Sequence, residues 1–197
     1  AADAVEAIVR RARSPGRKGR TKSQEDFVRR YFEHVPPRDM HEDDAANLAG
    51  AAIAHLEFAG TREPGRPKVR VFNPRSEVDG WHSDHMVVEV VTDDMPFLVD
   101  SVAASIAALG LSIDRLVHPV IPVERDEKGV LTGIPKGDPE DGYWESMIYI
   151  EAARVDAKTR RLLQDRLKET LADVRAAVVD WTKLQEAMAS DAERIRQ

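Results

Sequence analysis

One short stretch constrains the fold more than any other: residues 86–91 read MVVEVV and contain a single charged side chain. A run of β-branched residues with so little charge is typical of a central strand in a β-sheet. The strand is expected to end at Asp93 and Asp94, and Pro96 suits the first turn of a helix that Asp94 would cap. The stretch therefore predicts a central strand that leads directly into a helix.

The elements expected after this strand alternate between helices and strands. In order, they are a helix over residues 98–109, a strand over 113–123, a strand over 145–153, a helix over 156–174 and a strand over 176–180. Pro119 and Pro122 cannot donate hydrogen bonds to a neighbouring strand. The strand over 113–123 is therefore expected at a sheet edge, or interrupted by a bulge.

Together with residues 86–91, this order is strand, helix, strand, strand, helix, strand, which is the βαββαβ arrangement of ferredoxin-like folds. Right-handed crossovers place both helices on one face of a four-stranded antiparallel sheet with the strand order 4-1-3-2. We therefore predict an α+β fold, with a ferredoxin-like domain over residues 68–181. The other sheet face would expose apolar side chains such as Met147 and Tyr149, so we expect the N-terminal helices or a second sheet to cover it.

The first 67 residues predict an all-helical segment that precedes this domain. Helices are expected over residues 2–11, from Ser23 to the prolines at 36–37, and from Asp39 to Gly60. At the other end, residues 182–197 predict a C-terminal helix that leads into further chain. The first residue is Ala rather than Met, so we expect a fragment of a longer protein.

A basic linker is expected at about residues 10–22, which hold seven lysines and arginines and no acid. Clustered cations of this kind can bind nucleic acid by displacing counterions from phosphates. No aromatic residue in the linker would stack on bases, and the whole chain has a net charge of −6. We therefore favour a solvated linker and keep a nucleic-acid-binding arm as the lower alternative.

The composition excludes several classes of protein and site. There is no cysteine, which excludes disulfide scaffolds, cysteine-based zinc ribbons and cysteine nucleophiles. The longest mostly apolar run, residues 102–113, is too short to span a bilayer, and no secretory signal is visible. These features predict a cytoplasmic protein.

Four short motifs stand in order along the chain. They read FVRRYF at residues 27–32, KVRVFNP at 68–74, VVEVVTDDMPFLVDSV at 87–102 and HPV at 118–120. In this combination they resemble the N-terminal region of the large bacterial NAD-specific glutamate dehydrogenases, and the similarity covers most of the chain from about residue 22 onward. The resemblance implies an ACT-type regulatory module of ferredoxin-like topology, with the catalytic domain far downstream in a much longer homo-oligomeric enzyme.

The resemblance implies an enzymatic reaction for the parent protein and none for this chain. The parent would oxidise L-glutamate with NAD⁺ and water to 2-oxoglutarate, ammonium and NADH, and its other domains and subunits would be the partners of this chain. The chain itself has no Gly-x-Gly-x-x-Gly after a strand and so lacks a dinucleotide-binding fingerprint. We therefore assign it no catalytic residue and no cofactor, and assign NAD to the parent.

The candidate functional site is the loop after the central strand, with Asp93, Asp94, Met95, Phe97 and Leu98 as its residues. By resemblance, ACT modules that bind amino acids use this loop, in which Asp-x-Pro-Gly lets backbone amides approach the ligand. Phe97 stands where that glycine would be, and its benzyl group would fill the space of a small ligand. A packing or assembly role is therefore the first interpretation of the loop, and binding of an amino-acid effector is the second. Helix capping accounts for the two aspartates.

Histidines provide weaker candidates for a site. His82, Asp84 and His85 carry metal-binding groups, but side chains two and three positions apart at the start of a strand point in different directions. We therefore predict no metal site there. His118 precedes a proline in the expected edge strand and is interpreted as packed or hydrogen-bonded rather than as a catalytic base.

The function expected from these features is that of a non-catalytic regulatory and assembly segment of a large NAD-dependent glutamate dehydrogenase. The first alternative is an amino-acid sensor that binds its effector at residues 94–97. The lower alternative is a free-standing nucleic-acid-binding protein that uses the basic linker. A stand-alone enzyme has no support, because the sequence contains no nucleophile arrangement, metal cluster or phosphate cradle.

Overall fold

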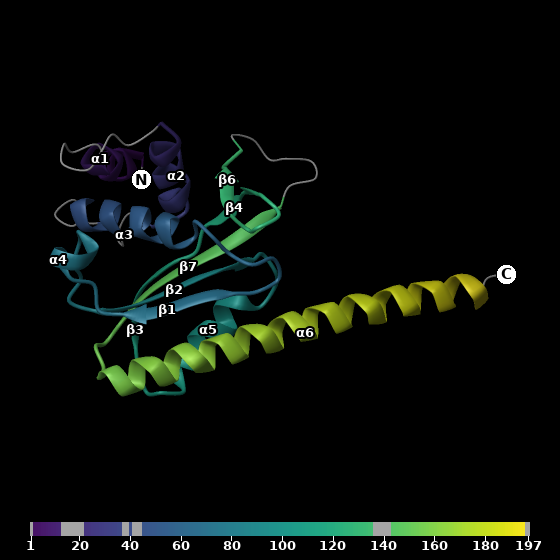
Figure 1. Ribbon diagram of the computed structural model, residues 1–197. Helices are drawn as coiled ribbons and strands as arrows, with labels where there is room; N and C mark the ends of the chain where they lie inside the picture. The colour runs from purple at the N-terminus through teal and green to yellow at the C-terminus, as the bar shows by residue number, and fades with distance from the viewer. Residues whose placement is uncertain (1, 13–21, 37–39, 41–44, 136–142, 196–197) are drawn as a thin grey trace.

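The computed structural model of the protein describes residues 2–12, 22–36, 40, 45–135 and 143–195 (Figure 1). Most of the basic linker predicted at 10–22 lies outside these residues, and so does the predicted helix start at Asp39. The two ends of that linker belong to the helices on either side of it.

Three helices come first along the chain, and a sheet with further helices follows them. The helices are α1 (Ala2–Ala12), α2 (Lys22–Phe32), α3 (Ala45–Phe58), the short α4 (Ser76–Asp79), α5 (Leu98–Ala107) and the long α6 (Ala157–Ile195). The strands are β1 (Lys68–Phe72), β2 (Met86–Asp93), β3 (Ile113–Val117), β4 (Val120–Pro122), β5 (Glu124–Arg125), β6 (Leu131–Gly133) and β7 (Trp144–Ala152). The fold is therefore a mixture of helices and antiparallel strands.

The main sheet separates two layers of helices (Figure 1). Side chains along β2 alternate between its faces: Val87 and Val91 pack with α1, α2 and α3, whereas Val88 and Val90 pack with α5 and α6. Both faces of β2 are therefore buried, which explains why its sequence is apolar at nearly every position instead of alternating with polar residues.

The strand order of the main sheet is β1-β2-β7-β3, and β4 also pairs with β7. The strand β2 lies between β1 and β7 and is antiparallel to both of them. The prediction of a central strand at residues 86–91 is therefore confirmed. The edge strand predicted over 113–123 is divided into β3 and β4, which pair with the same strand on either side of Pro119.

The fourth strand predicted over residues 176–180 is wrong, because these residues lie inside α6. The place beside β2 that this strand would fill is taken by β1, which precedes β2 in the chain. The complete βαββαβ order is therefore not formed. Ala176 and Ala177 favour a helix, and no Gly or Pro stands within α6 to end it. The predicted boundary at 181–182 falls within the same helix.

A buried histidine joins the N-terminal helices to the sheet. His55 of α3 is fully buried. The Tyr31 hydroxyl of α2 donates to its Nδ1 (2.7 Å), and its Nε2 donates to the Val90 carbonyl oxygen (3.2 Å). Because a carbonyl oxygen only accepts, Nε2 carries a ring proton, and the buried ring is neutral at neutral pH. Burial accordingly lowers the pKa of His55 to about 3.

We expect His55 to make the stability of the fold depend on pH. Above its ordinary pKa of 6.5 the ring is neutral in the folded and the unfolded chain, whereas between 6.5 and about 3 only the unfolded chain takes up the proton. As the pH falls through this range, the free energy of unfolding should fall by roughly 4 kcal/mol because of His55. Urea unfolding of wild type and His55→Gln at several pH values measures this contribution.

The control for this experiment is His82→Gln, because the His82 side chain is 50% exposed. That variant should keep the pH dependence of the wild type, and His55→Gln should lose the part due to the buried ring. The same dependence in wild type and His55→Gln would contradict the role of His55.

Candidate functional site

The predicted site loop connects β2 to α5 and contains one strained residue. Asp93 is the last residue of β2, Met95 is partly buried against the core under α5 and α6, and Leu98 begins α5 with a buried side chain. Phe97 has a φ of 69° and is the one non-glycine residue with positive φ in the described part of the chain. This conformation costs an L-residue about 1–2 kcal/mol. Phe97 is also 69% exposed, so it does not fill the ligand-sized space predicted for it.

The aspartates of this loop do not cap α5, which corrects the prediction. Phe97 occupies the cap position, and no side-chain hydrogen bond caps the helix there. The Asp94 N–H donates to the Trp144 carbonyl oxygen (2.9 Å), and its carboxylate accepts a hydrogen bond from the Ser146 hydroxyl (2.6 Å). Pro96 and Phe97 form a turn that separates Asp94 from the first amides of the helix. The two hydrogen bonds of Asp94 instead join the loop to β7.

Ser146 extends this contact to His118. His118 Nε2 lies 3.0 Å from Ser146 Oγ, and burial lowers the pKa of His118. Because the serine hydroxyl donates to Asp94, the imidazole N–H donates to the serine oxygen. Ser146 is fully buried and its proton is directed away from the histidine, so this arrangement holds the segments together and is not a nucleophile with its base.

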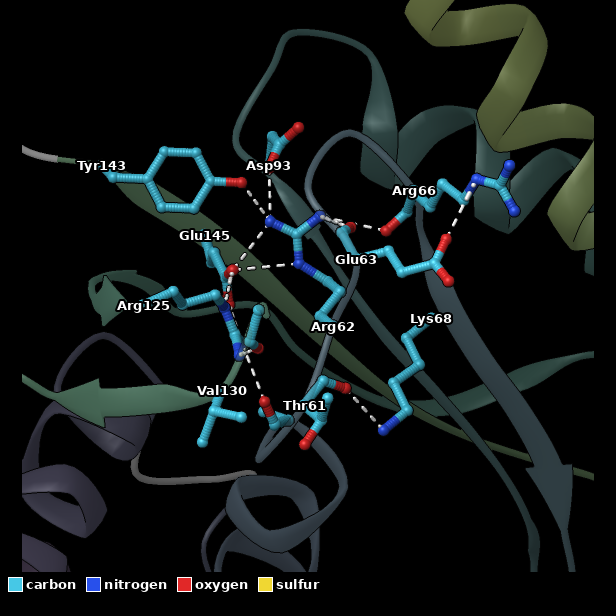
Figure 2. A network of polar contacts seen from close by, with 12 residues as sticks. Thr61, Arg62, Glu63, Arg66, Lys68, Asp93, Arg125, Val130, Tyr143 and Glu145 are labelled. Atoms are coloured by element: carbon cyan, nitrogen blue, oxygen red, sulfur yellow. Dashed lines mark hydrogen bonds and ion pairs between the residues drawn. The ribbon is translucent and has the colours of Figure 1, made fainter. Parts of the chain in front are cut away.

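A group of buried and partly buried polar side chains lies at the same end of the sheet (Figure 2). We call it the Arg62 network, and its members are Arg62, Asp93, Arg125, Tyr143, Glu145 and Arg175. Arg62, between α3 and β1, is 2% exposed and donates from Nε (2.9 Å) and Nη2 (2.7 Å) to Glu145 Oε1. The same guanidinium contacts the Asp93 carboxylate and the Tyr143 hydroxyl.

Glu145 is the centre of the Arg62 network and is fully buried near the start of β7. Arg125 of β5 donates to its Oε1 (2.7 Å) and Oε2 (2.8 Å), and also to the carbonyl oxygen of Ala59 just after α3 (2.8 Å). On the far side of the network, Arg175 of α6 pairs with Asp93. These contacts therefore join α3, β2, β5, β7 and α6 at one point.

The geometry of the Arg62 network is structural rather than catalytic. Three guanidinium groups surround two carboxylates, and both oxygens of Glu145 accept hydrogen bonds from arginines. Glu145 has no exposed surface through which a substrate would exchange a proton. The connection from β2 to α5 also contains no glycine that would let backbone amides approach a pyrophosphate, so it does not fit a dinucleotide.

Sequence reasoning identified Asp93 but not the other five members of the Arg62 network, which are Arg62, Arg125, Tyr143, Glu145 and Arg175. Glu145 stands 83 positions from Arg62 and 20 from Arg125, so no local motif links them. The available signal was indirect: Glu145 lies near the start of a strand with large apolar side chains on both faces, and a buried carboxylate requires a cationic partner.

We expect Glu145→Gln to destabilise the fold by about 3–5 kcal/mol, because it leaves the buried Arg125 guanidinium without its carboxylate and Arg62 with Asp93 alone. The matched control is Glu63→Gln, which breaks the ion pair between Glu63 and Arg66 (3.2 Å), whose side chains are 69% and 79% exposed. An exposed pair of this kind contributes about 0–1 kcal/mol. Urea unfolding compares the two variants, and equal losses would contradict the argument from burial.

The residues considered for a metal site, His82, Asp84 and His85, precede β2 at the end opposite the Arg62 network. His82 Nε2 is 3.2 Å from Asp84 Oδ1, whereas His85 Nε2 is 3.5 Å from Asp114 of β3. The side chains therefore do not converge on one point. Among the residues that the structure describes, no three His, Asp or Glu side chains are grouped as they would be around a metal ion. The described helices likewise include none with the length and apolar character needed to cross a membrane.

Comparisons with known proteins cover most of the chain, including every strand of the main sheet. Residues 27–171 match the family model described as "Glutamate dehydrogenase, ACT1 domain". The chain is 34% identical over 162 residues to the NAD-specific glutamate dehydrogenase of Pseudomonas aeruginosa, which is 81% of this chain and 10% of that protein. It is 30% identical over 186 residues to the NAD-specific glutamate dehydrogenase of Halomonas elongata, which is 93% of this chain and 12% of that protein. The chain thus spans about a tenth of the length of these relatives.

Proposed function

The chain belongs to the family of glutamate dehydrogenase ACT1 domains, and from this membership we propose that it is a non-catalytic regulatory and assembly segment of a large NAD-dependent glutamate dehydrogenase. The parent would convert L-glutamate, NAD⁺ and water to 2-oxoglutarate, ammonium and NADH, as a homo-oligomer in the cytoplasm. NAD would bind elsewhere in the parent, because no strand-to-helix connection in the described residues contains glycine. The partners of this chain would be other domains and subunits of the parent.

One observation carries this proposal: α6 extends well beyond the sheet (Figure 1), and it keeps an apolar side there. In its first half, buried leucines up to Leu171 pack against the sheet. By helical spacing the same side continues with Trp181, Leu184 and Met188, which are 59%, 50% and 64% exposed. We call these three residues the α6 stripe. Grouped exposed apolar side chains mark interaction surfaces, so the stripe suits a contact with another domain or subunit.

The helix that carries the α6 stripe is also joined to the site loop. Arg175 lies between the buried half of the helix and the stripe, and it pairs with Asp93, at which β2 passes into the loop. A contact made by the stripe would therefore act on the loop and on the Arg62 network through this ion pair. This connection supports a regulatory role in addition to assembly.

A second candidate function is the binding of an amino-acid effector at the loop from Asp94 to Phe97. The left-handed conformation of Phe97 favours it, because strained backbone is often retained where a ligand binds. Calorimetric titration with a panel of amino acids tests this function, and Phe97→Gly should then change the affinity. The absence of heat with every amino acid at millimolar concentration would dismiss it.

The assembly role predicts that polar substitution of the α6 stripe disturbs the parent enzyme. In the full-length enzyme, serine at positions 181, 184 and 188 should lower the mass found by light scattering or alter the kinetics of glutamate oxidation. The matched control is Val179→Ser, because Val179 is also exposed (44%) but lies on the opposite side of the helix.

The triple variant should keep the fold of the chain, because the three side chains lie outside the buried core. Circular dichroism of the 197-residue chain checks this point. A folded triple variant with the mass and kinetics of the wild type would refute the assembly role.

A further inference from the structure

A pocket of about 480 Å³ lies between the end of β1 and the start of α6. One wall comes from the end of β1 and the segment that follows it, and the other from the first turns of α6. The two walls are joined, because the Gln164 side-chain oxygen accepts a hydrogen bond from the Val71 N–H (3.0 Å). Phe72 pairs with Val87 near the start of β2, so the pocket lies at the opposite end of the sheet from the Arg62 network and the site loop.

Three arginines line this pocket, Arg75 from the segment after β1 and Arg160 and Arg161 from α6. In the part of the chain that the structure describes, none of the three forms an ion pair with a carboxylate, whereas the arginines of the Arg62 network do. Arg160 is partly buried, and its Nη1 donates to the Val155 carbonyl oxygen (2.7 Å). The described residues that line the pocket include no Asp or Glu, so three like charges share one space.

The place of two of these arginines in α6 is unfavourable for the chain alone. The start of a helix is the positive end of its dipole, yet the first turn of α6 holds no acid and contains Lys158 and Arg160, with Arg161 directly after it. The preceding Asp156 accepts the Thr159 N–H (2.8 Å), and this hydrogen bond lowers the pKa of the Asp156 carboxyl. Because that carboxylate is engaged with the backbone, the cations beside it call for an anion from outside the chain.

We propose that the pocket binds a small phosphate compound, either inorganic phosphate or a phosphate monoester. Guanidinium groups donate paired N–H groups to phosphate oxygens, and a phosphate charge of about −2 offsets three arginines better than a single carboxylate does. An amino acid suits the pocket poorly, because its ammonium group would lie among three cations with no carboxylate on the described walls to receive it.

The size of the pocket allows for either source of the phosphate group. Its volume is within the range of about 300–1,000 Å³ found for small-molecule sites, so the organic group of an ester has room beside the phosphate. The site is separate from the α6 stripe and from the loop at the other end of the sheet, and it depends on neither of the functions proposed for them.

The test is a calorimetric titration of the 197-residue chain with inorganic phosphate and with glycerol 3-phosphate. Each probe is added at constant ionic strength, because salt screens exposed charges. At least one of the two should bind saturably at millimolar concentration, and the tighter one identifies the source of the phosphate group. Acetate, which has a single carboxylate, should bind at least about tenfold more weakly.

Substitutions on both walls locate the site. Arg161→Gln and Arg75→Gln should each weaken phosphate binding about tenfold or more, because each removes a charged donor. The matched control is Arg166→Gln, because Arg166 is also exposed on α6 but does not line the pocket. This control should keep the affinity of the wild type.

Three results would overturn the proposal: a wild-type chain that binds neither phosphate probe, acetate that binds as tightly as phosphate, or an affinity that is kept in both Arg75→Gln and Arg161→Gln. An equal loss in Arg166→Gln would also overturn it, since binding would then follow the general charge of the helix. Circular dichroism checks that the variants fold. The comparison of phosphate with acetate uses the wild-type chain and so stands even if a variant does not.

Discussion

The pairing of one buried carboxylate with two guanidinium groups is the contact on which the arrangement of this protein depends. Glu145 has no exposed surface, and an unpaired buried carboxylate would be strongly destabilising. Arg62 and Arg125 must therefore both reach it, one from the segment after α3 and the other from β5. Through Asp93 the same network fixes the end of β2 and, by way of Arg175, the middle of α6. A single requirement for charge neutralisation thus positions helices and strands that are far apart in the chain.

The buried polar groups along the sheet differ in how fully they are hydrogen-bonded within the chain. At the Arg62 end, the buried carboxylate of Glu145 is paired within the chain. In the middle, Glu89 pairs with Arg70 (2.5 Å), but burial still raises the pKa of Glu89 to about 7, and its Oε1 has no hydrogen-bond partner. At the other end, the indole N–H of Trp81 is unpaired beside a pocket. The Arg62 end is therefore the one whose buried carboxylate is fully paired within the chain, which suits it for mechanical connection.

The central part of the fold was predictable from sequence because its signals are local. Apart from Glu89, residues 86–91 are apolar on both faces of β2, and the stretch that contains Pro119 lies at the edge of the sheet as predicted. The strand predicted at 176–180 failed because the choice of partner for β2 is not local: β1 already fills that edge, from more than a hundred positions earlier. The Arg62 network could not be predicted for the same reason, since its ion pairs join residues 20 to 83 positions apart. The resemblance placed Phe97 where a glycine would stand, but its left-handed conformation was not predicted, because phenylalanine is a poor signal for positive φ.

The failed strand and the exposed stripe are two consequences of one fact. Had residues 176–180 returned to the sheet, α6 would have ended above it, and the residues after it would have started a separate helix. Because β1 occupies the edge, nothing stops a run of residues with good helix propensity, and the apolar spacing that packs Leu171 on the sheet continues past the sheet to Met188. Beyond the sheet, the apolar side of the helix is exposed. Just before that part of the helix, Arg175 pairs with Asp93. A partner that covered the stripe would therefore act on a helix that the Arg175–Asp93 ion pair joins to the start of the site loop.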